Sequence, residues 1–128
     1  AIECGIGQLA KNGSMINDQL GSCFRLATVL TDMPFVADQP REIGVDEFCT
    51  SCKKCQTDCP PGAISNEKQL VRGDVKWYVD FDKCMPFLAE HKACGLCLST
   101  CPWSRPGIAP NLSQKMLKKM ARQATPAH

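Results

Sequence analysis

Residues 49–60 read CTSCKKCQTDCP, and residues 94–102 read CGLCLSTCP. The first stretch spaces its four cysteines as C-x2-C-x2-C-x3-C and ends with Pro60. The second stretch keeps the C-x2-C-x3-C-P part of this spacing, and nine residues separate its first cysteine from Cys84, the next cysteine towards the N-terminus. The ten cysteines of the chain therefore divide into two related runs of four and two that stand apart.

The spacing of the first run is the one with which bacterial ferredoxins bind [4Fe–4S] clusters. A cubane cluster needs four thiolates at its corners, and two-residue gaps let one tight loop supply three of them. In two-cluster ferredoxins the fourth cysteine of each run binds the other cluster, and the resemblance implies the same crossing here. The implied ligands are Cys49, Cys52, Cys55 and Cys101 for cluster one, and Cys84, Cys94, Cys97 and Cys59 for cluster two.

Structural zinc and disulfide bonds are the alternatives for a chain with this many cysteines. Four-cysteine zinc sites usually consist of two separated C-x2-C pairs, which three cysteines at successive two-residue gaps match poorly. Small secreted domains also carry many cysteines as disulfides, but the ferredoxin spacing would then be a coincidence. Both alternatives stay open at this stage, and the spacing favours two iron–sulfur clusters.

The composition indicates one domain or part of one, because 128 residues bury only a modest core, to which metal clusters add stability. The formal net charge of +2 argues neither for nor against a nucleic-acid partner. No run of about 20 apolar residues is present, so no segment of the sequence is expected to span a membrane. Because the chain begins with Ala1 and shows no signal peptide, we expect a fragment or a processed product.

The cysteine-poor N-terminal third shows mixed helix and strand signals. Residues 6–11 are expected to form a short helix that Asn12-Gly13 ends, and residues 14–16 a short strand. The apolar run 23–30 is typical of a largely buried strand.

The remainder of the sequence indicates a ferredoxin-like module in which strand, ligand loop and short helix occur twice. Residues 76–81 are expected to form a strand immediately before the second run. A helix follows Pro110, with an apolar face formed at helical spacing by Leu112, Met116, Leu117 and Met120. We expect this helix to pack its apolar stripe on the domain, and docking to a partner or an anionic membrane surface is the alternative.

Four blocks of the sequence together resemble the C-terminal part of corrinoid-dependent reductive dehalogenases. In chain order they are GIGQLAKNGSMI (5–16), RLATVLTDMPF (25–35), FCTSCKKCQTDCPPGAI (48–64) and CGLCLSTCPWSRPG (94–107). The most specific parts of the resemblance are the order of the blocks and the TDMP segment before the first run. Most of the corrinoid-binding core of that family, with its proton-donating tyrosine, would lie before Ala1.

The resemblance implies an α+β fold, in which a bacterial ferredoxin-like two-[4Fe–4S] module follows the C-terminal end of a nitroreductase-like cobalamin-binding core. On this division residues 1–43 end the incomplete corrinoid-binding core, and residues 44–110 form the double-cluster module. Residues 111–128 form a basic amphipathic helix and tail.

The function implied by the resemblance is electron transfer from the two clusters to a corrinoid, cobalamin, which removes halide from an organohalide substrate. The implied partners are a low-potential electron donor and a small membrane anchor subunit, with no nucleic acid among them. The implied location is the outer face of the cytoplasmic membrane, in association with that membrane. We expect this chain alone to hold clusters without completing the reaction.

Three residues outside the cysteine runs are site candidates. Arg25 is the only charged residue in its apolar run, and an unpaired buried guanidinium is costly. It either points to solvent or to a structural carboxylate, or it faces a catalytic pocket and stabilises a phenolate or a leaving halide. The resemblance also places Gly7 and Asn12 near the lower side of the corrinoid, because glycine lets the backbone approach a cofactor closely.

Two other functions compete with dehalogenation. Epoxyqueuosine reductases, which modify tRNA in the cytoplasm, are also similar to this chain in the GIGQLAKNGSMI segment and the double cluster. They usually carry a longer insert after the first cysteine of the second run, and the nine-residue gap here favours the dehalogenases. A standalone two-cluster ferredoxin would need no cofactor contacts from residues 1–40.

Overall fold

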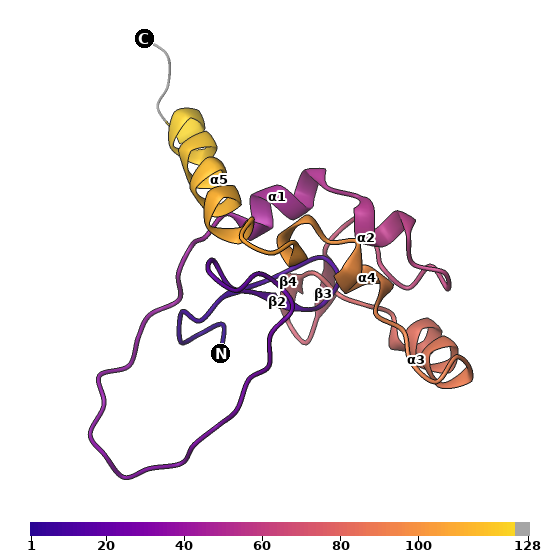
Figure 1. The fold of residues 1–128 in the computed structure, drawn as a ribbon, viewed down its shortest axis with the longest axis horizontal. Helices are drawn as coiled ribbons and strands as arrows, with labels where there is room; N and C mark the ends of the chain where they lie inside the picture. The colour runs from indigo at the N-terminus through magenta and orange to yellow at the C-terminus, as the bar shows by residue number, and fades with distance from the viewer. Residues whose placement is uncertain (125–128) are drawn as a thin grey trace.

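The computed structural model of the chain describes residues 1–124 and combines helices with two small antiparallel sheets (Figure 1). Its strands are β1 (Gln8–Leu9), β2 (Met15–Ile16), β3 (Gln69–Val71) and β4 (Asp74–Lys76). Its helices are α1 (Val45–Ser51), α2 (Lys54–Thr57), α3 (Phe81–Glu90), α4 (Leu96–Ser99), the 3-10 helix η1 (Pro102–Ser104) and α5 (Ala109–Ala124). The expected mixture of helix and strand is present, and the end of the predicted tail, 125–128, lies outside the described residues. No helix among the described residues is both long and apolar enough to cross a lipid bilayer.

The N-terminal hairpin replaces the helix expected over residues 6–11, and that prediction is wrong. The antiparallel strands β1 and β2 pair Gln8 with Ile16 and Leu9 with Met15. Asn12-Gly13 lies in the turn between the strands, where Gly13 adopts φ +76°. Asn-Gly between two short strands favours a hairpin turn, whereas the sequence interpretation took it for a helix end. The strand expected over residues 14–16 is confirmed at β2.

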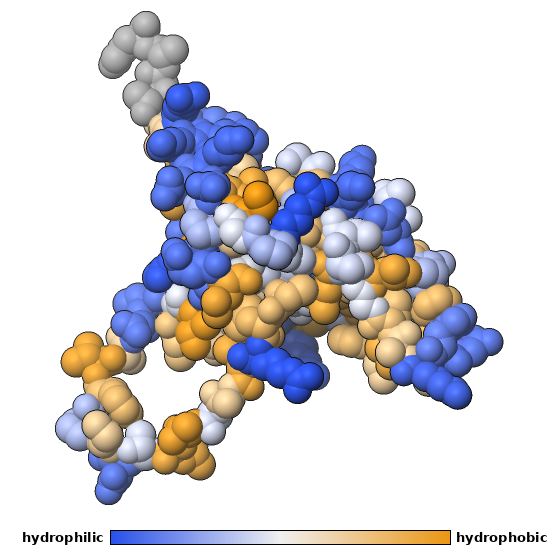
Figure 2. All heavy atoms as spheres, in the orientation of Figure 1, coloured by the Kyte–Doolittle hydropathy of each residue, from blue (hydrophilic) through white to orange (hydrophobic). Residues whose placement is uncertain are grey.

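A long loop, residues 23–43, leaves the hairpin without forming helix or strand (Figure 1). The buried strand expected over residues 23–30 is wrong, because Val29 and Leu30 are 83% and 92% exposed. No strand among the described residues pairs with this run, so no neighbouring strand buries its apolar side chains. Apolar residues lie on the surface of the loop, interleaved with polar ones (Figure 2).

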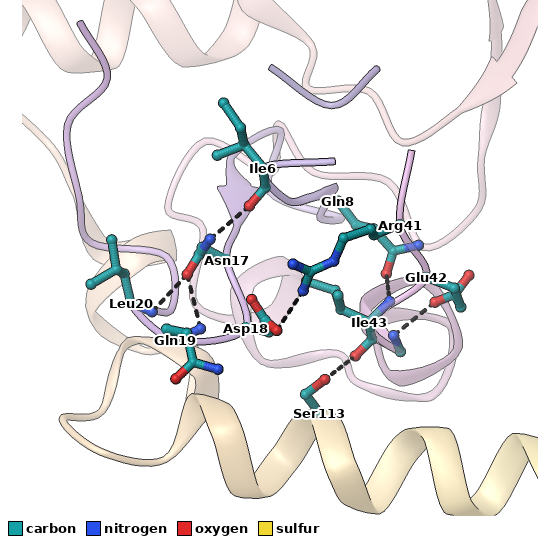
Figure 3. A network of polar contacts seen from close by, with 11 residues as sticks. Ile6, Gln8, Asn17, Asp18, Gln19, Leu20, Arg41, Glu42, Ile43 and Ser113 are labelled. Atoms are coloured by element: carbon teal, nitrogen blue, oxygen red, sulfur yellow. Dashed lines mark hydrogen bonds and ion pairs between the residues drawn. The ribbon is translucent and has the colours of Figure 1, made fainter. Parts of the chain in front are cut away.

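Side-chain contacts fix the base of this loop (Figure 3). Arg41 donates to Asp18 at 2.6 Å, which joins the returning end of the loop to the segment after β2. The side-chain oxygen of Gln8 accepts from the backbone N–H of Ile43 at 3.0 Å. The hydroxyl of the buried Ser113, on α5, donates to the Ile43 carbonyl at 2.8 Å. The returning end of the loop is therefore held against the hairpin, the segment after β2 and α5.

Two similar halves follow the loop, and each carries one cysteine run. In each half a helix with the first cysteine (α1 or α3) precedes a shorter helix with the third (α2 or α4), and Cys-Pro follows. Helices α2 and α4 pack against each other, which joins the halves. The strand expected over residues 76–81 is only partly present: β4 ends at Lys76 and Val79 makes an isolated bridge. The strand cannot continue further because Asp80 caps the N-terminus of α3.

The main hydrophobic core joins the hairpin, α1, η1 and α5. Its buried residues include Ala10, Ile16, Val45, Cys49, Trp103 and Ala109. The helix expected after Pro110 is confirmed as α5, and it packs on α1. The buried face of α5 differs from the apolar face expected from the sequence. Ser113 and Met116 are buried, whereas Leu117 is 39% exposed. Three parts of the chain that are distant in sequence thus share one core.

Candidate iron–sulfur sites

The first three cysteines of the first run and the last cysteine of the second run lie around one small pocket. Helix α1 supplies Cys49, Cys52 follows at its C-terminal end, and α2 supplies Cys55. Cys101, immediately before η1, completes the group. We call these four residues thiol site one.

The other four cysteines line a second pocket, and we call them thiol site two. They are Cys59, Cys84, Cys94 and Cys97. Helix α3 carries Cys84 and α4 carries Cys97. The apolar side chains that line the same pocket include Ile64, Val79, Phe81 and Phe87. The structure therefore brings together the two sets of four that the ferredoxin resemblance implies, while ligation of iron by each set stays a prediction.

Burial makes bare thiolates unfavourable at both sites. At thiol site one, burial raises the pKa of Cys49 to about 12 and the pKa of Cys55 to about 11. Burial is also the main cause that raises the pKa of Cys101 and of Cys97. The pKa of Cys97 is raised further by the negative charges of its three companions, Cys59, Cys94 and Cys84. Iron at the centre of each group would offset these costs, because metal binding requires and stabilises thiolates.

The set of donors fits an iron–sulfur cluster. Among residues 1–124, no three His, Cys, Asp or Glu side chains converge as tightly as one chelated metal ion requires. The thiols of each site instead surround a pocket. A [4Fe–4S] cube takes its four thiolates at separate corners, which suits four cysteines spread in this way.

Two residues of the N-terminal segment lower the pKa of thiols at site one. The backbone of Lys11 lowers the pKa of Cys49, and the side chain of Ser22 lowers the pKa of Cys101. Both effects partly oppose the effect of burial.

Asn12 lies between the two thiol sites and contributes to the lining of both pockets. It is 6% exposed, its amide donates to the Cys97 carbonyl at 3.0 Å, and its oxygen accepts from the Ser14 N–H at 3.1 Å. Gly7 is buried in the hairpin, where a side chain would overlap the carbonyl of Ile16. Within this chain Asn12 therefore lines the thiol sites, and Gly7 allows the hairpin backbone to pack closely. Their contact with a corrinoid stays a prediction.

Arg25 is exposed on the loop 23–43, and no acidic side chain among the described residues forms an ion pair with it. It lines neither thiol pocket. The structural carboxylate considered from the sequence is therefore not found in the described part of the chain, and the catalytic role stays a prediction.

Lys11 and Ser22 lie at thiol site one and were missed by sequence reasoning, because both lie outside the cysteine runs. A usable signal exists for Lys11, since it is the only charged residue in the block 5–16. Ser22 has no such signal, because only the folded chain brings it to Cys101.

Comparisons with known proteins agree with this geometry. The model of the 4Fe-4S dicluster domain family matches residues 48–105, which contain both cysteine runs. The tetrachloroethene reductive dehalogenase of Sulfurospirillum multivorans is 36% identical over 117 residues, which cover 84% of this chain and 23% of that protein. The chain is similar to the iron–sulfur region of reductive dehalogenases. The Desulfitobacterium hafniense tetrachloroethene reductive dehalogenase is 37% identical over 118 residues, 82% of this chain and 21% of that protein. The chain thus spans about a fifth of the length of these two curated reductive dehalogenases.

Solved reductive dehalogenase structures share the fold. The catabolic reductive dehalogenase NpRdhA in complex with 3-bromo-4-hydroxybenzoic acid superposes with a TM-score of 0.78 at 29% identity, covering 96% of this chain and 19% of that chain. A reductive dehalogenase structure that suggests a mechanism for B12-dependent dehalogenation gives the same values. The epoxyqueuosine reductase of Cyclobacterium marinum is 28% identical over 113 residues, 82% of this chain and 36% of that protein. Identity is therefore higher to the two tetrachloroethene reductive dehalogenases than to this epoxyqueuosine reductase.

Proposed function

We propose that the chain carries electrons through two [4Fe–4S] clusters to a corrinoid, in an enzyme that removes halide from organohalides. The observation that carries the proposal is that each thiol site combines cysteines of both runs, in a chain related to reductive dehalogenases. One cluster would be held by Cys49, Cys52, Cys55 and Cys101, and the other by Cys59, Cys84, Cys94 and Cys97. When bound, the clusters supply one-electron transfer.

The residues around the thiol sites hold the two sites near each other. Helices α2 and α4, which carry Cys55 and Cys97, pack against each other. Asn12 lines both pockets and so connects the two sites. An apolar lining disfavours the extra negative charge of a reduced cluster, which suits a low reduction potential.

We also propose that the loop 23–43 packs against a corrinoid-binding core supplied by the rest of a longer protein. Its base is fixed, yet its exposed apolar residues include Leu26, Val29, Leu30, Phe35 and Val36. Exposed apolar segments of this size mark interaction sites. On this proposal residues 1–43 complete a nitroreductase-like core, residues 44–110 form the double-cluster module, and residues 111–128 follow it.

The proposed corrinoid site lies next to this N-terminal region. Arg25 would face its pocket from the loop 23–43. Gly7 and Asn12 would shape the hairpin backbone at its edge. The remaining partners in the proposal are an organohalide, a low-potential electron donor and a small membrane anchor subunit, at the outer face of the cytoplasmic membrane and without nucleic acid. The names of the relatives, tetrachloroethene and trichloroethene reductive dehalogenases, support the substrate class.

The full-length protein tests the proposal. Purified with cobalamin and supplied with a low-potential donor, it should release halide from a chlorinated or brominated substrate. A parallel assay should use tRNA that contains epoxyqueuosine. Conversion of this tRNA without halide release from any organohalide would replace the proposal with the epoxyqueuosine reductase alternative. Stable clusters with neither activity would favour a plain electron carrier.

A further inference from the structure

Lys11 is buried as deeply as the centre of the hydrophobic core. Its exposed fraction is 1%, and it is among the largest fully buried side chains. Burying an ammonium group without a counter-charge is costly. No carboxylate among residues 1–124 forms an ion pair with Lys11. The described chain therefore leaves this positive charge without a negative partner.

The contacts of the Lys11 ammonium are all to neutral groups. Its Nζ donates to the Cys52 carbonyl at 2.8 Å and to the side-chain oxygen of Asn66 at 3.5 Å. It also lies 5.0 Å from the centroid of the Trp77 ring. These contacts fix the position of the charge without cancelling it.

The charge of Lys11 lies at only one of the two thiol sites. Lys11 lines the pocket of thiol site one. Lys54 also lines this pocket but is exposed, so that solvent screens its charge. Among the described residues, the pocket of thiol site two has no lysine, arginine, aspartate or glutamate in its lining. The two sites therefore differ by one buried cation.

We propose that the Lys11 ammonium is the counter-charge of the cluster at thiol site one and makes this cluster the first of the two to be reduced. The proposal rests on the two-cluster function proposed above. A cubane cluster with four thiolates is a dianion, and it becomes a trianion when it accepts one electron from the low-potential donor; no bond forms or breaks. A fixed cation stabilises the trianion more than the dianion, and the interaction is strong where water is excluded. Lys11 thus acts on the potential of the cluster through its charge.

The test uses the full-length protein, purified with its clusters under anaerobic conditions. Lys11→Met keeps an unbranched apolar side chain and removes the charge, and Lys11→Arg keeps the charge. Electron paramagnetic resonance during a reductive titration gives the potential of each cluster, and Cys59→Ser and Cys101→Ser assign the two signals. At a fixed solution potential, Lys11→Met should lower the ratio of reduced to oxidised cluster at thiol site one about tenfold or more, which is about 59 mV for one electron. The cluster at thiol site two should keep its potential, and Lys11→Arg should restore that of thiol site one.

Lys68 provides a matched control. It lies 5.5 Å from the centroid of the same Trp77 ring, but it is ion-paired with Asp46 at 2.7 Å and lines neither thiol pocket. Lys68→Met should therefore leave both potentials unchanged. Equal shifts from Lys11→Met and Lys68→Met would overturn the proposal, because the buried charge would then have no special effect.

If Lys11→Met loses the cluster at thiol site one, Asn66→Asp tests the proposal in its place. Asn66 is exposed, so the change should not disturb folding, and it places a carboxylate beside the Lys11 ammonium. We expect a smaller fall in potential, again at thiol site one alone. Unchanged potentials in Asn66→Asp, with both clusters present, would contradict the inference. A wild-type protein without two clusters would instead contradict the proposed function, so the two failures are distinguishable.

Discussion

The side-chain amide of Asn12 donates a hydrogen bond to the backbone carbonyl of Cys97 at 3.0 Å, across 85 positions of sequence. This bond joins the turn of the N-terminal hairpin to α4, the helix that carries one thiol of site two. The neighbouring Lys11 contacts thiol site one from the same turn. The hairpin therefore supports both thiol sites, although it contains none of their cysteines.

Asn12→Ala should destabilise the protein by about 1–3 kcal/mol, because it removes the side-chain partners of the Cys97 carbonyl and the Ser14 N–H at a partly buried place. Urea unfolding of the cluster-loaded protein would measure the loss. Iron should also leave the variant faster, from thiol site two first. Asn111→Ala, an exposed change on α5, is the control and should alter stability by no more than about 0.5 kcal/mol. Equal stability of both variants would show that the hydrogen bond from Asn12 to the Cys97 carbonyl does not stabilise the fold.

Cys59→Ser and Cys101→Ser should each damage the cluster of the opposite run. Cys59 lines the pocket that holds Cys94 and Cys97, and Cys101 lines the pocket that holds Cys49. The wild-type protein should contain about eight irons and eight acid-labile sulfides per chain. Electron paramagnetic resonance should show a changed signal of cluster two in the first variant and of cluster one in the second. The reverse pattern would refute the crossed ligands.

Gly44→Ala should destabilise the protein more than Gly73→Ala. Both glycines have a left-handed backbone, with φ +85° at Gly44 and φ +87° at Gly73, so the strain of an added side chain is similar. At Gly44 the new methyl group would also overlap the side chain of Met116, whereas Gly73 faces open space. We expect an additional cost of about 1–3 kcal/mol at Gly44 from this overlap. Denaturant unfolding of the two variants measures the difference, and equal losses would mean that α5 simply moves aside.

Cluster assembly should become more favourable as pH rises from about 7 towards 9. The pKa of Cys49 in the protein without iron is raised to about 12 and that of Cys55 to about 11, so both thiols are protonated at neutral pH. Each must lose its proton to bind iron, and the bound form therefore carries fewer protons than the free form. By linkage, higher pH favours the bound form.

Reconstitution in weak buffer at about pH 7 should release protons from the coordinating thiols, in addition to those that inorganic sulfide loses as it enters the clusters. Cys4→Ala is the control, because Cys4 lines neither thiol pocket and should leave the proton release unchanged. A yield of clusters that falls with rising pH would contradict the prediction.

Arg25→Leu in the full-length enzyme should slow turnover by roughly 10²–10³, as removal of one preorganised charge at a catalytic site does. Because Arg25 is exposed on a loop, cluster content and the stability of this part of the protein should not change. Arg122→Leu, an exposed change near the end of α5, is the control and should leave turnover unchanged. Normal turnover in Arg25→Leu would show that Arg25 is a surface residue without a catalytic role.

The sequence predicted elements well where one short segment determines its own structure. The cysteine runs specify two tight ligand loops, and the pattern around Met116 specifies α5. Asn12-Gly13 was misjudged because the same dipeptide ends helices and forms hairpin turns, and only pairing across the turn decides between them. The apolar run 23–30 misled for a different reason. Hydrophobicity predicts burial, but the described residues supply nothing to bury this run against.

Local sequence also predicts the two thiol sites only in part. Spacing predicts that Cys49, Cys52 and Cys55 act together, because short gaps constrain the backbone, whereas the exchange of the fourth cysteine was implied by the ferredoxin resemblance. Spacing cannot find Lys11 or Ser22, which reach thiol site one only after the hairpin has packed on α1. Their positions follow from the tertiary fold and not from any local pattern.

The exchange of cysteines between the two halves has a consequence for biosynthesis. Cys49, Cys52 and Cys55 leave the ribosome before the second run, but the fourth member of their group is Cys101, the last cysteine of that run. Thiol site two is complete once Cys97 has been made, only four residues earlier. Neither pocket can form while the first half alone has emerged, so cluster loading would require translation to Cys97 for thiol site two and to Cys101 for thiol site one. A nascent chain that stalls between the two runs would present Cys49, Cys52, Cys55 and Cys59 together, as an incomplete set exposed to oxidation.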